Sequence, residues 1–404
     1  MNRTPSRRHV RLAVFLLAAA LPGSAAAQLA NTAWPMHQHD PQHTGRSQFN
    51  GPQGPNPTVA WAVRQVGDRK TAPSVGAGGT IYLGTAKTPI TAIDPANGMP
   101  IWVPDDSGGQ TESHPAIDVN GNVYLGARDN DLWSIGPTGH VNWRFSVPTD
   151  GDVTTPPTIA SDGTIFMASD SLGVGRLYAM HPNGTVKWLT VLGHGVKNVS
   201  PALSHDQTEL YVTAAGNLAI GLDAQTGAEL WSIALQPFTV GSRANDYSPV
   251  VAANGTIYFG LRSGLFAVNP TNHTATTVFP APAKELIMSP PALAADGTIY
   301  LTSSGRPSPV VRAINPNGSV KWTATIPGRG RARNTPPVVG ADGKVYVGVG
   351  NYVTCFNPAG DGLGGPDIVW QLPFPRSFDA GAIIGGPGIL YFGLSDDKLY
   401  KVTD

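Results

Sequence analysis

The chain has 404 residues and no net charge, because 27 lysines and arginines balance 27 aspartates and glutamates. Charged residues make up 13% of the sequence, where about 25% is usual in soluble domains. No block of lysine or arginine follows residue 11, so the electrostatic footprint of a nucleic-acid or anionic-membrane binder is missing. The 48 glycines and 37 prolines favour strands and turns over surface helices.

An export signal is predicted over residues 1–27. Basic residues precede an apolar run from Leu12 to Leu21, and small residues end the segment. This order is typical of a cleavable signal peptide cut before Gln28, and the run is too short to span a membrane. The pair Arg7-Arg8 is also found in twin-arginine signals, which leaves the export route open. We therefore expect a periplasmic or secreted protein with no membrane span, and no lipid anchor because no cysteine ends the signal.

Residues 28–57 are predicted to form a capping segment and a linker ahead of the repeats. Three histidines, His37, His39 and His43, lie close together in the sequence and could hold a metal ion through their imidazoles. The alternative, which we prefer, is a capping turn pinned by Trp34 whose histidines face water. Only Asp40 would add a further ligand nearby.

Residues 58–404 consist of repeats. In each copy a proline opens one short strand and an aromatic residue marks the next, and nine residues separate the two in six of seven copies. The pairs are Pro73 with Tyr82, Pro115 with Tyr124, Pro157 with Phe166, Pro201 with Tyr211, Pro249 with Tyr258, Pro291 with Tyr300, and Pro337 with Tyr346. An eighth copy lacks the proline and ends on Tyr391-Phe392.

The first two strands of most copies are joined by Asn-Gly or Asp-Gly, as at Asn120-Gly121 and Asp162-Gly163. These dipeptides tolerate positive φ, so two-residue type I′ hairpins are predicted. A third strand follows, and after a glycine turn a fourth strand carries a tryptophan, except in the fifth copy, which has Val278 or Phe279 in its place. The tryptophans are Trp102, Trp143, Trp188, Trp231, Trp322 and Trp370.

Eight copies of four short antiparallel strands predict an all-β fold, an eight-bladed β-propeller. The last copy stops at residues 399–404 without a fourth strand, and the strand at residues 58–64 around Trp61 has no earlier partner. We predict that these two strands pair, so that both ends of the repeat region share one blade and no sheet edge stays open between them. The seven tryptophans are expected to pack between blades. Cys355 is the single cysteine, which excludes an internal disulfide, and its apolar surroundings predict a small core residue.

The motif A-x-D-x-x-T-G-x-x-x-W is approached by AIDPANGMPIW at residues 92–102 and by GLDAQTGAELW at residues 221–231. It resembles the blade motif of the pyrroloquinoline-quinone-type (PQQ-type) propeller family, and the resemblance extends over residues 33–404. The family contains periplasmic quinoprotein dehydrogenases and non-enzymatic members of outer-membrane assembly, so the resemblance implies the fold and leaves the activity open. The dehydrogenases carry long insertions with Ca²⁺ ligands and a catalytic aspartate, and often a vicinal disulfide. This chain has short repeats, one cysteine and no C-x-x-C-H haem motif.

The loops before the first strand of each blade are expected to open onto one mouth of the central channel. They contribute Glu112, His114, Asp152, Lys197, Asn198, Asn245, Asp246, Arg333, Asn334 and Asp379. As a hypothesis, this ring could coordinate a polar ligand or Ca²⁺, with Asp246 and Asp379 as the first carboxylates to test. The alternative, which we favour, is a water-filled mouth whose charges satisfy turns. No recognisable catalytic triad, carboxylate pair or phosphate loop is present.

We therefore expect a non-catalytic binding or scaffold module whose partner is another envelope or secreted protein, with neither nucleic acid nor a cofactor as its ligand. The alternative is a small periplasmic quinoprotein oxidoreductase that uses PQQ and Ca²⁺ to oxidise alcohols or sugars.

Overall fold

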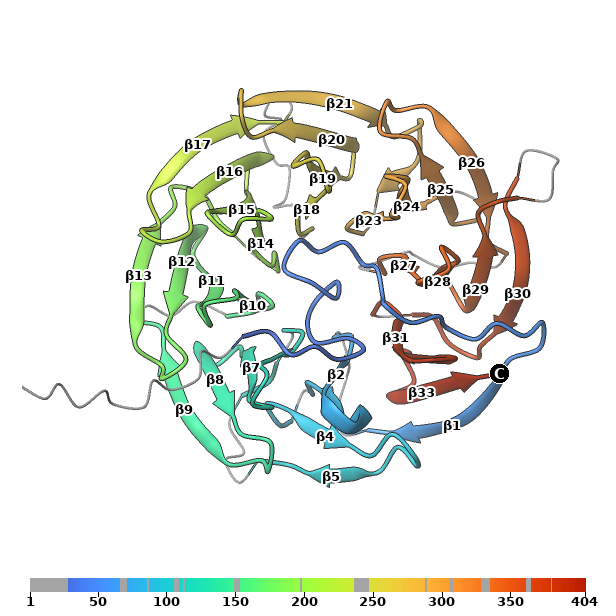
Figure 1. The fold of residues 1–404 in the computed structure, drawn as a ribbon, viewed down its shortest axis with the longest axis horizontal. Coiled ribbons are helices and arrows are strands. Elements are labelled where there is room, and N and C mark those ends of the chain that lie inside the picture. Colours follow the sequence, from blue (N-terminus) through green and yellow to red (C-terminus); the bar gives the residue numbers. More distant parts are fainter. Residues whose placement is uncertain are drawn as a thin grey trace, which may run out of the picture.

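A computed structural model describes residues 28–65, 71–85, 87–104, 109–111, 113–148, 153–196, 198–235, 247–287, 289–305, 308–327, 335–360, 365–378 and 380–404. These residues form eight antiparallel sheets arranged as blades around a central axis (Figure 1). The predicted eight-bladed propeller is confirmed. In seven blades the chain runs outward from a short strand at the axis to a strand at the rim, and in the eighth blade the rim strand comes from the start of the repeat region.

The innermost strands are β2 (Ser74–Val75), β6 (Ala116–Ile117), β10 (Thr158–Ile159), β14 (Ala202–Leu203), β18 (Val250–Val251), β23 (Ala292–Leu293), β27 (Val338–Val339) and β31 (Ile383–Gly386). The second strands are β3 (Ile81–Leu83), β7 (Val123–Gly126), β11 (Ile165–Ser171), β15 (Glu209–Ala214), β19 (Ile257–Leu261), β24 (Ile299–Ser304), β28 (Val345–Val349) and β32 (Ile389–Gly393). The third strands are β4 (Thr91–Ile93), β8 (Asp131–Ile135), β12 (Val174–Met180), β16 (Leu218–Asp223), β20 (Gly264–Asn269), β25 (Val310–Ile314), β29 (Tyr352–Asn357) and β33 (Lys398–Thr403).

The outermost strands are β5 (Pro100–Trp102), β9 (Val141–Ser146), β13 (Val186–Val191), β17 (Glu229–Ala234), β21 (Thr274–Pro280), β26 (Val320–Thr325), β30 (Asp367–Pro373) and β1 (Thr58–Arg64). The sixth blade has an extra strand, β22 (Leu286–Ile287), which pairs with β24. The only helical turn in the described part of the chain is η1 (Ala77–Gly79), in the first blade.

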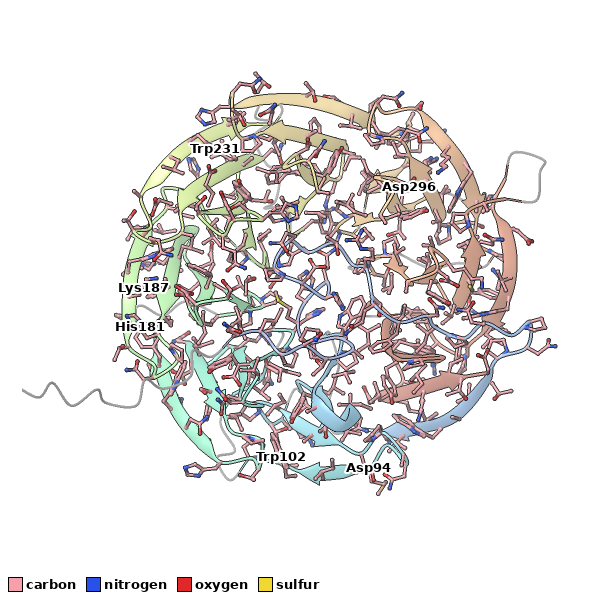
Figure 2. The ribbon with its side chains drawn as sticks, viewed as in Figure 1. Asp94, Trp102, His181, Lys187, Trp231 and Asp296 are labelled. Atoms are coloured by element: carbon pink, nitrogen blue, oxygen red, sulfur yellow. The ribbon has the colours of Figure 1, made fainter. Side chains whose placement is uncertain are left out.

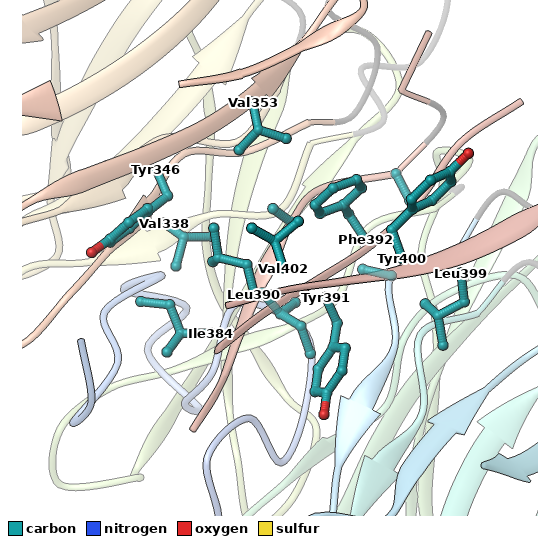
Figure 3. Close-up of a cluster of buried hydrophobic side chains, with 14 of the residues drawn as sticks. Val338, Tyr346, Val353, Ile384, Leu390, Tyr391, Phe392, Leu399, Tyr400 and Val402 are labelled. Atoms are coloured by element: carbon teal, nitrogen blue, oxygen red, sulfur yellow. The ribbon is translucent and has the colours of Figure 1, made fainter. Parts of the chain in front are cut away.

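The ring is closed by β1, which pairs antiparallel with β33 from Thr58 opposite Thr403 to Arg64 opposite Lys398. The predicted joining of the two ends in one blade is therefore confirmed. This closing blade packs against both neighbours, because one buried cluster contains Val75 of the first blade, Tyr346 of the seventh and Phe392 of the eighth (Figure 3). Cys355 belongs to the same cluster and is fully buried, and burial raises the pKa of its thiol to about 12. The prediction of a core cysteine is confirmed.

Each tryptophan of the outer strands links its blade to the next. Figure 2 shows Trp102 and Trp231 on the outer strands of the ring. The indole of Trp102 donates to the carbonyl of Pro137 at 2.8 Å, and that of Trp143 donates to Pro182 at 2.7 Å. Both acceptors lie in the turn between the third and fourth strands of the following blade. Within its own blade each such indole lies 5.8 to 6.0 Å from the aromatic ring that marks the second strand.

The turn that receives the tryptophan is built by the aspartate, threonine and glycine of the repeat motif. In the fourth blade Asp223 accepts hydrogen bonds from the Thr226 hydroxyl and amide, and these bonds lower the pKa of the carboxyl group. Gly227 follows with a φ of 73°, and its amide donates to the Asp223 carbonyl at 2.8 Å. A Cβ at Gly227 would lie 2.5 Å from Cε3 of Trp188 in the third blade. The repeat motif therefore has a structural role: it shapes the turn against which the tryptophan of the preceding blade packs.

The hairpins between the first and second strands differ from the prediction. In the second blade only Gly121 has a positive φ, at 79°, whereas Asn120 does not. The Gly121 amide donates to the Asp118 carbonyl at 2.9 Å and the Asp118 amide to the Asn122 carbonyl at 3.0 Å, which makes a three-residue loop with a glycine bulge. The prediction of type I′ turns is wrong. The Asn or Asp residue instead accepts from the backbone through its side chain, as Asp162 does from the Thr164 amide at 2.9 Å.

The role of the turn glycine can be tested with a matched pair of substitutions. Gly227→Ala and Gly255→Ala both place a side chain at positive φ, 73° and 81°, but only at Gly227 is the Cβ position blocked; at Gly255 nothing lies within 4 Å. We expect each variant to lose about 1 kcal/mol from backbone strain and Gly227→Ala to lose a further 1 to 3 kcal/mol, roughly, from overpacking against Trp188. Urea denaturation measures the free energies of unfolding, and equal losses would contradict the packing role.

Candidate functional site

The central channel is crossed by the segment that precedes the first blade. In Figure 1 residues 28–57 run through the middle of the ring before they reach β1 at the rim. Carbonyl groups of this segment accept hydrogen bonds from the amide of the second residue of six innermost strands. The pairs are Val75 to Trp34, Ile117 to Pro35, Leu203 to Pro41, Val251 to Gln42, Leu293 to Thr44, and Val339 to Gly45, all between 2.8 and 2.9 Å.

Side chains of the same segment fill the space around the axis. Met36 and His43 are completely buried, and His37 and Gln38 are nearly so. The Gln38 amide donates to the Pro291 carbonyl of the sixth blade at 2.8 Å. The prediction that the histidines of this segment face water is therefore wrong for His37 and His43. Seven of the eight innermost strands are only two residues long, and the axis-facing amides of six of them find their partners in this segment and not in a sheet.

Two histidines of the segment meet a third from the ring. Nδ1 of His37 lies 3.3 Å from Nδ1 of His114, and the two rings are nearly perpendicular with centroids 4.7 Å apart. Nε2 of His37 lies 3.2 Å from the Ser248 hydroxyl. His43 contacts the Pro249 carbonyl through Nδ1 at 3.1 Å and the Thr158 hydroxyl through Nε2 at 3.4 Å. We refer to His37, His43 and His114 as the histidine cluster.

Burial decides the charge of the histidine cluster. It lowers the pKa of His43 and of His114 to about 4, and it lowers the pKa of His37 well below its ordinary value. The nearby Asp40 carboxylate raises the pKa of His43, but less than burial lowers it. All three imidazoles are thus neutral at pH 7, and their ring nitrogens serve as hydrogen-bonding groups between the segment and the ring.

The third histidine of the segment points elsewhere. The ring of His39 packs edge-on against Trp34 at 5.2 Å, and its Nδ1 lies 3.5 Å from a carboxylate oxygen of Asp40. His37, His39 and His43 therefore do not converge. Over the described ranges, no group of three histidine, cysteine, aspartate or glutamate side chains could hold a metal ion.

Of the ten residues predicted at the channel mouth, the structure describes two. His114 is buried against the segment, as part of the histidine cluster. Asn198 lies half-buried in the loop between β13 and β14, with a φ of 57°. The others lie outside the described residues and remain predictions; they are Glu112, Asp152, Lys197, Asn245, Asp246, Arg333, Asn334 and Asp379.

Buried hydroxyl groups also line the inner edge of the ring and tie adjacent blades together. Ser74 donates to the Pro115 carbonyl at 2.6 Å, and Thr158 donates to the Pro201 carbonyl at 2.6 Å. Ser113 likewise donates to the Thr155 carbonyl at 3.0 Å. Sequence reasoning missed these residues, although serine or threonine recurs beside the proline in most repeats.

The described part of the channel does not fit PQQ and Ca²⁺. An anionic quinone needs open space with cationic or amide donors around it, and Ca²⁺ takes six to eight oxygen ligands, roughly, with carboxylates among them. Here side chains of the segment occupy the axis, the imidazoles are neutral, and hydroxyls such as those of Ser74 and Thr158 are engaged between blades. We therefore assign no step of chemistry to a cofactor in this channel.

The fold defines the class of protein: an eight-bladed propeller of four-stranded sheets, closed by its first strand and crossed by an N-terminal segment. A family model described as outer membrane protein assembly factor BamB matches residues 55–171, 128–276 and 206–402. Together these matches span nearly all eight blades, and the chain belongs to this family of PQQ-like repeat propellers. No match was found among curated proteins.

Solved structures share the fold at low sequence identity. BamB from Moraxella catarrhalis is 19% identical with a TM-score of 0.65, over 86% of this chain and 100% of that one. Quinohemoprotein alcohol dehydrogenase ADHIIG from Pseudomonas putida HK5 is 12% identical with a TM-score of 0.74, over 93% and 80%. The quinohemoprotein alcohol dehydrogenase from Comamonas testosteroni is 14% identical with a TM-score of 0.73, over 94% and 81%. The chain thus shares its fold with BamB and with the alcohol dehydrogenases, and this similarity establishes the architecture alone.

No helix in the described ranges is long and apolar enough to cross a membrane.

The histidine cluster predicts acid sensitivity. Folding lowers the pKa of His43 and of His114 from 6.5 to about 4, so the unfolded chain binds more protons between those values. Stability is therefore fully present above pH 6.5 and falls as the pH falls toward 4, by up to about 1.4 kcal/mol per pH unit for each histidine. His114→Gln should flatten the dependence of the unfolding free energy on pH between 4.5 and 6.5, roughly, whereas the exposed His140→Gln should leave it unchanged. An equal slope in all three proteins would contradict the cluster's role.

Proposed function

We propose that the chain is an exported, non-catalytic binding or scaffold module of the cell envelope whose partner is another protein. The observation that carries this proposal is the filling of the channel by residues 28–50, which leaves the rim and the loops as the surfaces for binding. The family model, described as an outer membrane protein assembly factor, supports a role in protein contacts. The signal peptide predicted over residues 1–27 supports export.

The rim of the third blade has the character of a protein-binding edge. Its outer strand β13 exposes Val186, Leu189 and Val191, with 41%, 45% and 59% of their surface accessible. Beside it, Leu172 at the tip of the β11–β12 hairpin is fully exposed. Leu172 also has a φ of 53°, which a bulky residue rarely adopts. An outer strand leaves one row of backbone groups unpaired within its sheet, so a partner strand could add there while its side chains cover the valines.

The binding surface is tested by charge substitution at the rim. The double variant Leu189→Asp/Val191→Asp is compared with Val119→Asp, an equally exposed valine in a hairpin of the second blade. With the processed chain as bait in chemical crosslinking of envelope extract, we expect one partner captured by the unchanged chain and by Val119→Asp. The double variant should reduce that crosslinking yield at least about tenfold, as expected when the binding free energy weakens by about 1.4 kcal/mol or more. Undiminished capture by the double variant would place the surface elsewhere.

The oxidoreductase alternative has a separate test. The processed chain is mixed with PQQ and Ca²⁺, and dye reduction is followed with alcohols and sugars as substrates. We expect no turnover above that of free quinone, because the described channel holds no cradle for the cofactor. Quinone-dependent turnover would overturn the proposal of a non-catalytic module.

A further inference from the structure

We propose that the inner edge of the ring is a peptide-binding site, and that its resident ligand is the chain's own segment at residues 28–50. The segment contacts every blade. Besides the six amide contacts to the inner strands, the Gly388 amide of the eighth blade donates to the Asn50 carbonyl at 2.9 Å. His43 reaches Thr158 of the third blade at 3.4 Å. The site thus consists of inner-strand amides from six blades, a hydroxyl of the third blade and a turn amide of the eighth.

The segment contacts the ring as a bound peptide would, because it adds no strand to any sheet. It forms only isolated bridges to the ring, such as Trp34 with Val75 and Arg46 with Val339, and no strand of its own before Thr58. Three of its residues, Gln38, His39 and His43, have φ values of 50°, 79° and 58°. Non-glycine residues rarely adopt this region, so the surrounding ring imposes the conformation.

Side chains give the site its sequence preference. Trp34 is 3% exposed at the first blade and Met36 is fully buried in a cluster with Tyr124 of the second blade and Ile159 of the third. Gln38 donates its side-chain amide to Pro291 in the sixth blade. The ligand class is therefore a peptide that turns within the ring and carries an aromatic anchor, an unbranched apolar side chain and an amide at alternate positions, as in Trp34, Met36 and Gln38.

The tether between ligand and ring can be cut without disturbing either. Pro55 and Asn56 are exposed, whereas Pro52 accepts a hydrogen bond from Trp370 and Gln53 donates to Tyr346. Cutting between residues 55 and 56 therefore leaves these contacts on the peptide and leaves β1 in the closing blade. In the intact chain the tether keeps the peptide at high effective concentration near its site.

The experiment uses the full chain with a protease site inserted between Pro55 and Asn56. The protein is folded first and cleaved afterwards, and gel filtration then separates free from bound fragment. We expect the N-terminal fragment to co-elute with the ring and to exchange saturably with a labelled synthetic peptide of residues 28–55. The melting temperature of the cleaved protein should rise with peptide concentration, as it does for any ligand that binds only the folded state.

Variants decide whether recognition is specific. Trp34→Ala should weaken retention of the fragment at least tenfold, whereas Asn31→Ala, at an exposed position, should not. A cleaved ring that unfolds on dilution and recovers when peptide is added also supports the site. The proposal is overturned if the fragment leaves while the melting temperature stays unchanged, if added peptide restores nothing, or if Trp34→Ala is retained like the unchanged fragment.

Discussion

The antiparallel pairing of β1 with β33 is the constraint on which the rest of the structure depends. Each blade of a propeller buries its two faces against its neighbours, so an open array would leave the first and last blades with one bare face each. Pairing of Thr58–Arg64 with Lys398–Thr403 removes both bare faces. Trp61 then occupies the place of the other outer-strand tryptophans, with its indole donating to the Pro95 carbonyl at 3.2 Å. Trp61 therefore makes the same contact between blades in the closing blade that Trp102 and Trp143 make in theirs.

Closure also places the residues ahead of β1 at the rim beside the seventh blade, where they form hydrogen bonds with that blade. Four of the other indoles, among them those of Trp102 and Trp143, donate to a turn of the following blade, but no turn joins β33 to β1 in the eighth blade. Pro52 provides the missing carbonyl and accepts from Trp370 at 3.0 Å. The carboxylate of Asp404 accepts from the amides of Gln53 and Gly54, both at 2.7 Å. Hydrogen bonds thus connect the N-terminal segment to the seventh blade and to the C-terminal residue that follows β33.

The fold could be predicted from the sequence because its determinants recur. Proline, tyrosine and tryptophan return at nearly constant spacing, and the unpaired strand around Trp61 matches an unfinished copy at the other end. The type I′ turns were a wrong prediction because Asn-Gly and Asp-Gly also suit a three-residue loop, in which only the glycine takes positive φ. The Asn-Gly or Asp-Gly dipeptide alone does not determine how many loop residues separate the two strands of a hairpin.

The environment of the N-terminal segment could not be predicted for a different reason. His37 is polar and lies in an irregular stretch, which favours exposure, but its partners His114 and Ser248 come from the second and fifth blades. Only the closed ring brings these residues together, so no local pattern reports the burial. The same holds for the inner-edge hydroxyls, whose acceptors lie one blade away. The channel-mouth residues outside the described ranges, Asp246 and Asp379 among them, stay predictions.

Residues 28–50 fill the channel of the closed ring, and the proposed function depends on this feature. Hydrogen exchange of the native protein tests this most directly, at the amides of Leu203, Val251, Leu293 and Val339, which donate to the segment and not to a neighbouring strand. We predict that these four amides exchange as slowly as amides within the second and third strands of the same blades. Exchange at the rate of exposed loop amides, while those strands stay protected, would contradict it.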